Sequence, residues 1–295
     1  MLLGGVVTAG AVLGALLATG GGGGRSAAGP SSSVPLSSAA SPSPTAIVPP
    51  VSTAPAPSPS TSVAFPPRPP DSQHGPVIIV PGYGGDRQML DPLAAALRKA
   101  GRTTITLDLP NNATGDLRGQ AQVLAAQVAA SLKAGAKSVD LVGYSAGGIV
   151  VALYTQTDPS HVRRVVTIGS PLHGTRIAGL AEGLAPSACP VACQQMAPGS
   201  SLLSSLADAA PARTGVPWLS MWTSHDEVVL PPTSAQFDGA RNVELQSICP
   251  DDAAGHVTLP ADPLAIGLTA TALNSWPTPF PTPAASSCAA LRAAG

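Results

Sequence analysis

The segment GYSAG at residues 143–147 has the G-x-S-x-G spacing that is typical of a serine nucleophile. Gly and Ser are so frequent in this chain that a chance match is expected with odds of about one in three. The neighbouring residues make the match more specific, because the apolar run DLVG precedes Ser145 and the helical pattern AGGIVVALY follows it. We therefore predict that Ser145 lies on a strained turn between a strand and a helix, with its hydroxyl raised above the sheet. An ordinary strand–loop–helix connection of small residues is the alternative.

A second glycine-rich segment, PGYGG at residues 81–85, follows the first apolar run after the Pro-rich N-terminal part of the chain. Acyl transfer needs two hydrogen-bond donors about 3 Å from the oxygen that becomes negatively charged. We predict that the main-chain N–H groups of Tyr83 and Ala146 form this oxyanion hole. Pro-Gly and Gly-Gly also make simple tight turns, which is the alternative for this segment.

A serine hydroxyl is a weak nucleophile until a base accepts its proton. After a G-x-S-x-G turn of this kind, the acid and then the histidine follow the serine along the chain. His256 comes late enough to follow a suitable acid, and we predict that it is the base. His225 is the second candidate, although Glu182 and Asp208, which precede it, lie in an irregular segment. The remaining histidines are His74, His161 and His173.

The predicted acid is Asp226, which directly follows the apolar segment WLSMW. A strand end places a side chain at the functional edge of a parallel sheet. There the carboxylate would hold the imidazole of His256 in the right tautomer and stabilise the imidazolium. The alternatives are Glu227, Asp251 and Asp252, of which the last two are closer to His256 in sequence but belong to a loop.

The elements that must position these residues alternate between strands and helices. Apolar runs predict strands at residues 77–80, 103–107, 139–142 and 165–168, followed by strands at 218–222 and 242–246. Helical patterns cover residues 91–100, 116–134, 146–156 and 261–274, with Asp91 as the expected N-cap of the first. Continuously apolar strands are typical of a parallel sheet that is buried on both faces. The predicted fold class is therefore α/β, a mostly parallel sheet flanked by helices.

The N-terminal quarter of the chain differs in composition from the rest. Residues 1–25 begin with an uncharged apolar stretch, which predicts a signal peptide or an N-terminal anchor. Residues 26–72 are rich in Pro, Ser and Ala, which predicts a disordered linker or stalk. The catalytic domain is expected at residues 73–276, with an insertion at about 172–215 over the strand ends. Residues 277–295 form a Pro/Ala tail.

Charge and cysteine content restrict the class of protein. Charged residues make up 11% of the chain and the net charge is −1, so there is no electrostatic case for binding nucleic acid or an anionic membrane. Four cysteines in an exported chain predict two disulfides. Three pairings are open, of which Cys189–Cys193 with Cys249–Cys288 is the local one. We expect a protein that is secreted or anchored at the cell surface through an uncleaved N-terminal segment.

The segments PVIIVPGYGG, VDLVGYSAGG, VVTIGSPLHGT, WLSMWTSHDEVV, DGARNVELQ and AGHVTLP together resemble bacterial secreted lipases of the α/β-hydrolase superfamily. The likeness is to the small lipases of Bacillus type and their actinobacterial relatives, over about residues 76–275. It implies the α/β-hydrolase fold, with Ser145 as nucleophile, Asp226 as acid and His256 as base. The chain departs from such lipases at Pro81, where His commonly precedes the glycine, and at Tyr144, where His is frequent.

The residues and the resemblance both imply serine-dependent hydrolysis of carboxylic esters through an acyl-enzyme, with acylglycerols as the expected substrates. An acyltransferase or a polyester hydrolase would use the same triad. The alternative of another class is a catalytically inactive surface module that binds a ligand in the same cleft. No cofactor and no metal is required. The expected partners are an ester or lipid substrate and a lipid interface, with no nucleic acid, and a monomer is favoured.

Overall fold

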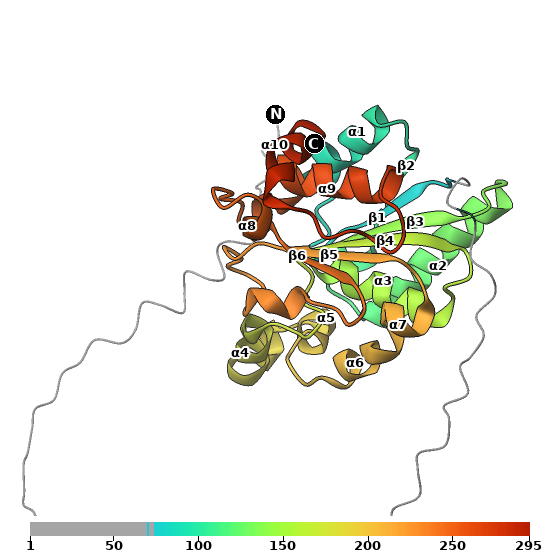
Figure 1. Ribbon diagram of the computed structural model, residues 1–295. Helices are drawn as coiled ribbons and strands as arrows, with labels where there is room; N and C mark the ends of the chain where they lie inside the picture. The colour runs from blue at the N-terminus through green and yellow to red at the C-terminus, as the bar shows by residue number, and fades with distance from the viewer. Residues whose placement is uncertain (1–69, 71–73) are drawn as a thin grey trace, which may run out of the picture. The chain divides into compact units, whose positions relative to one another are not determined.

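One parallel sheet of six strands forms the centre of the described residues, which are 70 and 74–295 of a computed structural model (Figure 1). The strand order is β2-β1-β3-β4-β5-β6. The strands are β1 (Val77–Val80), β2 (Thr104–Thr106), β3 (Val139–Tyr144), β4 (Val162–Ile168), β5 (Trp218–Trp222) and β6 (Arg241–Glu244). The predicted leader at residues 1–25 and the predicted linker at 26–72 lie outside the described residues, apart from residue 70.

Helices cover both faces of this sheet. On one face in Figure 1 lie α1 (Asp91–Lys99), α9 (Pro263–Asn274) and α10 (Cys288–Ala293), and on the other lie α2 (Leu117–Lys133) and α3 (Ala146–Thr157). Side chains alternate along β1, so Ile78 and Val80 pack in the core cluster of α2 and α3, whereas Val77 and Ile79 pack in that of α1 and α9. Because both faces are buried, β1 is apolar at every position.

The predicted strands and helices are all present in residues 74–295, and the differences lie at their ends. β4 begins at Val162 instead of residue 165, because Arg163 and Arg164 are buried within it and interrupt the apolar pattern. The predicted strand at 242–246 ends at residue 244, and α8 (Leu245–Ile248) begins there.

The start of the first helix also differs from the prediction. A 3-10 turn at Gln88–Leu90 runs directly into α1, and the side chain of Asp86 accepts a hydrogen bond from the N–H of Gln88 at 2.9 Å. Asp91 therefore lies in the first turn of α1 and is not its N-cap. The local polar cap comes from Asp86, one turn earlier in the chain.

The insertion at residues 172–215 consists of short helices linked by turns. They are α4 (Arg176–Leu184), α5 (Val191–Gln195), α6 (Ser201–Ser204) and α7 (Pro211–Thr214). Gln195 anchors α5 to the start of α2, where its side chain accepts a hydrogen bond from the N–H of Leu117 at 2.8 Å. In contrast, Ala178 is the buried residue of α4, and its Leu180 and Leu184 are 62% and 71% exposed. The insertion thus has an anchored part and an exposed apolar helix.

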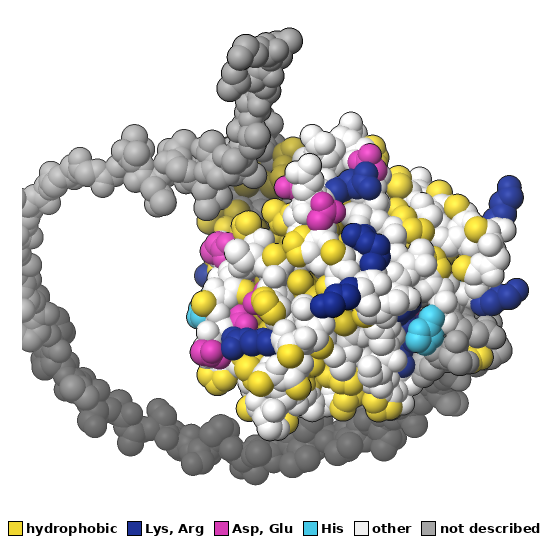
Figure 2. All heavy atoms as spheres, turned by 90° about the horizontal axis from the view of Figure 1, so that it is seen from above, with side chains coloured by type: hydrophobic (Ala, Val, Ile, Leu, Met, Phe, Trp, Pro, Cys, Tyr) yellow, Lys and Arg dark blue, Asp and Glu magenta, His cyan; other side chains and the backbone are white. Residues whose placement is uncertain are grey.

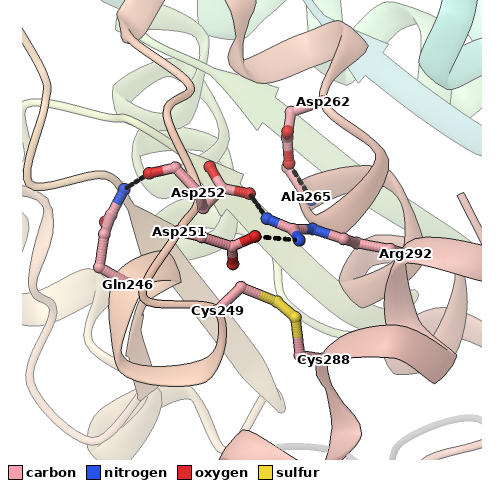
Figure 3. Close-up of a disulfide and its surroundings, with 8 residues drawn as sticks. All are labelled: Gln246, Cys249, Asp251, Asp252, Asp262, Ala265, Cys288 and Arg292. Carbon is pink, nitrogen blue, oxygen red and sulfur yellow. Dashed lines mark hydrogen bonds and ion pairs between the residues drawn. A yellow bond between two sulfur atoms is a disulfide. The ribbon is translucent and has the colours of Figure 1, made fainter.

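Two disulfides join the cysteines in the local pairing that the sequence favours, Cys189 with Cys193 and Cys249 with Cys288. The second one ties the C-terminal tail to the body of the domain (Figure 3). Within the tail, Arg292 of α10 binds the carboxylates of Asp251 and Asp252 at 3.0 and 3.3 Å. Residues 277–295 therefore end in a helix that is held to the domain covalently and by ion pairs.

Removal of the Cys249–Cys288 disulfide by a double serine substitution should destabilise the protein more than removal of Cys189–Cys193. The two bonds join residues 39 and 4 positions apart, and a crosslink restricts the unfolded chain more when it closes a longer loop. The chain-entropy relation gives about 4 kcal/mol for the long loop and about 2 kcal/mol for the short one. Urea unfolding of both double variants measures the difference, and equal losses would contradict this account.

Asp262, which caps α9, should make stability depend on pH. Desolvation is the main cause that raises the pKa of its carboxyl above the ordinary 3.8, and the charge of Asp252 adds to it. A carboxyl whose pKa is raised in the folded state contributes most to the free energy of unfolding below its unfolded pKa. This contribution is lost as pH rises through the folded pKa. Asp262→Asn keeps an acceptor for the N–H of Ala265. We expect this variant to be more stable than the wild type near neutral pH.

Urea unfolding at neutral and acidic pH measures this effect of Asp262→Asn. The difference from the wild type should disappear once the pH falls below 3.8, the ordinary pKa of the carboxyl. Its size should stay below about 1 kcal/mol, because solvent screens a partly exposed charge. A stability gain that does not change with pH would show that the carboxyl charge is not its source.

The face of the domain over α1, α9 and α10 carries charges of both signs among uncharged side chains (Figure 2). No large area of a single charge is visible on that face, in agreement with the net charge of −1 for the chain. Among residues 74–295, none of the helices has the length and apolar character that a membrane span requires.

Candidate active site

Ser145 stands between the end of β3 and the start of α3, in the strained conformation that the sequence predicts. Its φ is 52° and its ψ is −128°, a region that residues with a side chain rarely adopt. The turn is possible because the flanking residues are glycines. A Cβ at Gly143 would lie 2.5 Å from the Cα of Gly148, and one at Gly147 would lie 2.3 Å from the carbonyl oxygen of Val80. Only glycine lets strand and helix approach this closely.

The structure brings together the three side chains that the sequence singles out. His256 Nε2 lies 3.0 Å from Ser145 Oγ, and His256 Nδ1 lies 2.8 Å from Asp226 Oδ2. All three residues are buried, with exposed fractions of 8% for Ser145 and 4% for the other two. This order of contacts allows the imidazole to accept a proton from the serine while the carboxylate stabilises the positive charge.

The carboxylate of Asp226 is fixed by the loop that follows β5. Its Oδ1 accepts hydrogen bonds from the N–H groups of Val228 and Val229 at 2.9 and 2.7 Å, which leaves Oδ2 for His256. Because both oxygens are engaged, the side chain has one favourable orientation. The end of β5 and the tight loop after it thus hold the carboxylate of Asp226 in a fixed position.

Two residues that the sequence analysis did not assign to the site hold the main chain of His256. Tyr144 donates its hydroxyl to the carbonyl oxygen of His256 at 3.0 Å, and Glu227 accepts the His256 N–H at 2.9 Å. Burial, together with the negative charges of Asp226 and Glu227, raises the pKa of the Tyr144 hydroxyl, so it remains a proton donor. From the sequence, Tyr144 is a departure from the lipases and Glu227 is an alternative acid. Neither residue type nor its position in the chain indicates the contact with His256.

The segment at residues 81–85 passes directly over the serine. A Cβ at Gly82 would lie 2.8 Å from Ser145 Cβ, so glycine is required for this approach. Ala146 is the first residue of α3, and its N–H therefore has no partner within the helix. Neither this group nor the N–H of Tyr83 donates to another main-chain group in the described part of the chain. The N–H of Ala146 is thus available next to Ser145.

The remaining candidates have other partners. Asp251 and Asp252 bind Arg292, and Glu227 binds the main chain of His256. His225 lies beside Asp226 in sequence, but the imidazole that Asp226 contacts is that of His256. His173 approaches the carbonyl oxygen of Ser234 at 3.3 Å. In residues 74–295 there is no group of three His, Cys, Asp or Glu side chains that could hold a metal ion.

Comparisons with known proteins agree with this architecture. Residues 75–183 match the family described as the alpha/beta hydrolase fold. Aspergillus fumigatus lipase B superposes with a TM-score of 0.60 at 20% identity, covering 75% of this chain and 61% of the lipase. The mature form of Bacillus licheniformis lipase BlEst2 superposes with a TM-score of 0.56 at 19% identity, covering 72% of this chain and 96% of the lipase.

At these identities a structural likeness shows the fold and not the activity. No curated protein sequence matches the chain. The family match nevertheless agrees with the parallel sheet of six strands and the helices on both of its faces, as described for residues 74–295. The protein has the α/β-hydrolase fold.

Proposed function

We propose that this protein hydrolyses carboxylic esters through an acyl-enzyme formed on Ser145. The observation that carries the proposal is the buried chain of contacts from Ser145 Oγ to His256 and from His256 to Asp226, at 3.0 and 2.8 Å. Such an arrangement activates a serine, because the imidazole is oriented by the carboxylate and is already within reach of the hydroxyl proton. The strained turn at Ser145 and the N–H of Ala146 at the start of α3 fit the same role.

In the proposed mechanism, Ser145 Oγ attacks the ester carbonyl carbon while His256 takes the hydroxyl proton. The carbonyl oxygen becomes negatively charged and is bound by the N–H groups of Tyr83 and Ala146, each such donor contributing about 3 to 4 kcal/mol to the transition state. His256 then donates its proton to the leaving alcohol, which departs. Water attacks the acyl-enzyme with His256 again as base, and the acid product leaves.

We propose acylglycerols as substrates and the activity of a lipase of the small secreted bacterial type. Large exposed apolar side chains in the insertion support a lipid-like substrate, namely Leu180, Leu184 and Val191. The low charge of the chain fits a neutral substrate, and the similar Aspergillus and Bacillus structures are both named lipases. The two disulfides support export of the protein, since such bonds persist in oxidising compartments.

Hydrolysis of p-nitrophenyl esters, from acetyl to palmitoyl, by the full-length protein tests this function. Activity that is lost in Ser145→Ala would support the proposal, and the preferred acyl chain would separate an esterase from a lipase. A competing alcohol would reveal an acyltransferase through its ester product, and a polyester film would reveal a polyester hydrolase. A folded wild type that hydrolyses no ester and is not labelled at Ser145 by a fluorophosphonate would favour the inactive binding module.

We further predict that the insertion at residues 172–215 gates access to Ser145. The exposed apolar side chains of α4 cost free energy in water, and contact with a lipid surface would remove that cost and favour an open arrangement. Hydrolysis of a triglyceride should therefore increase when its concentration exceeds the solubility limit and an emulsion forms. A rate that follows the dissolved substrate alone, with no increase at that limit, would contradict gating by this segment.

A further inference from the structure

The loop that carries the acid and the loop that carries the base are bonded to each other by a residue outside the triad. We define the acid loop as residues 223–227 and the base loop as residues 249–258. Thr223 is fully buried, and its hydroxyl donates to the carbonyl oxygen of Ala254 at 2.7 Å. The hydroxyl oxygen of Thr223 also accepts a hydrogen bond from the N–H of His225 at 3.1 Å. This one hydroxyl thus connects a point just before Asp226 with a point just before His256.

Gln246 of α8 forms a second bridge between the same two loops. Its Oε1 accepts the N–H of Ser224 at 2.9 Å, and its Nε2 donates to Thr223 Oγ1 at 2.9 Å and to the carbonyl oxygen of Asp252 at 3.0 Å. Figure 3 shows the amide of Gln246 turned toward Asp252. Only an amide supplies one acceptor and two donors in this way, because a carboxylate cannot donate and an apolar side chain can do neither.

The C-terminal helix supports the base loop from its other side. Asp252 accepts the N–H of Ala254 with Oδ1 and binds Arg292 of α10 with Oδ2, at 3.1 and 3.3 Å. The disulfide from Cys249 to Cys288 joins the start of the base loop to the start of α10 (Figure 3). The C-terminal tail is thereby connected to the base loop at two points.

We infer that Gln246 and Thr223 are positioning residues that set His256 against Asp226, and that α10 braces the base loop through Arg292 and the Cys249–Cys288 bond. The inference rests on the proposed function, because positioning has a kinetic meaning only if these residues form a catalytic pair. Neither Gln246 nor Thr223 has a hydrogen bond to Ser145. Their loss should therefore lower kcat and leave KM nearly unchanged.

The variants Gln246→Leu and Thr223→Val remove the bridging groups at nearly constant volume. Each should lower kcat by about 10- to 100-fold, the cost of a displacement of about 1 Å between catalytic groups. Gln246→Glu keeps the acceptor but removes the two donors, so its kcat should fall as well. Thr223→Ser keeps the hydroxyl, so its kcat should stay close to that of the wild type. The matched control is Gln156→Leu. Gln156 lies at the C-terminal end of α3, away from Ser145, and the substitution removes its hydrogen bond to the carbonyl oxygen of Ser205.

A second measurement is independent of substrate. Proton NMR of the full-length protein should show a low-field signal from the Nδ1 proton that His256 shares with Asp226. The signal should be present in the wild type, in Gln156→Leu and in Thr223→Ser, and lost or broadened in Gln246→Leu and Thr223→Val. If the latter two variants keep either the signal or kcat, the inference is overturned. If the wild type hydrolyses no ester, the proposed function fails, and the NMR signal alone decides whether these residues position His256.

Discussion

Replacing His256 by alanine should reduce ester hydrolysis by about 10⁴- to 10⁶-fold, because Ser145 then has no group to accept its proton. Ser145→Ala should cost as much. Asp226→Asn should cost about 10⁴-fold, because the amide favours the wrong tautomer of the imidazole. The double variant Ser145→Ala with His256→Ala should be no slower than either single variant, since residues that act as a unit do not contribute additively. Initial rates with the preferred p-nitrophenyl ester measure all four variants.

The control for these variants is His225→Ala. His225 directly precedes Asp226 and is the second histidine that the sequence offers, but His256 is the residue in contact with both Ser145 and Asp226. We expect the activity of His225→Ala to stay within about threefold of the wild type, a change of less than 1 kcal/mol. A large loss in His225→Ala together with a small loss in His256→Ala would exchange their roles and contradict the proposed triad.

The positions of most strands and helices can be predicted from the sequence, because the sheet lies in the middle of the domain. The central strands are buried on both faces and are therefore rich in apolar residues, a pattern that is visible without knowing which strands pair. The turn at Ser145 is equally local, since the glycines at 143 and 147 signal the close approach of strand and helix. The pairing order of the strands and the start of β4 are not local. The start of β4 depends on the distant carboxylate and carbonyl groups that bind Arg163 and Arg164.

The residues that support the site were not predictable for the same reason. Ser145, Asp226 and His256 are found from motif spacing and chain order, which are properties of the sequence. The hydroxyl of Tyr144 and the carboxylate of Glu227 act on His256, which lies 112 and 29 positions away in the chain. Such contacts exist only after the sheet has brought the strand ends together. The identity of the acid and the base can therefore be predicted from motif spacing and chain order. The orientation of the base depends on contacts that form only in the folded domain.

The largest effect on stability is expected at Asp140, which lies in β3 at the opposite end of the sheet from Ser145. Its carboxylate is fully buried and binds the guanidinium groups of both Arg102 and Arg163, which are buried as well. Arg102 also donates to Asn274 Oδ1 at 3.0 Å, and Arg163 donates to the carbonyl oxygen of Leu273 at 2.6 Å. One carboxylate thus neutralises two cations that join β3, β4 and the end of α9.

Asp140→Ala should lower the free energy of unfolding by about 3 to 5 kcal/mol, because it leaves buried positive charge without its counter-ion. The matched control is Asp208→Ala, which breaks an ion pair with Arg213 at 2.9 Å in which both side chains are more than half exposed. Exposed pairs contribute only about 0 to 1 kcal/mol. Urea unfolding compares the two variants, and similar losses would mean that burial of the pair is unimportant. Because Asp140 and Ser145 are separated by about 16 Å of strand, the folded fraction of Asp140→Ala should retain the wild-type kcat, so that a loss of activity would follow the loss of folded protein.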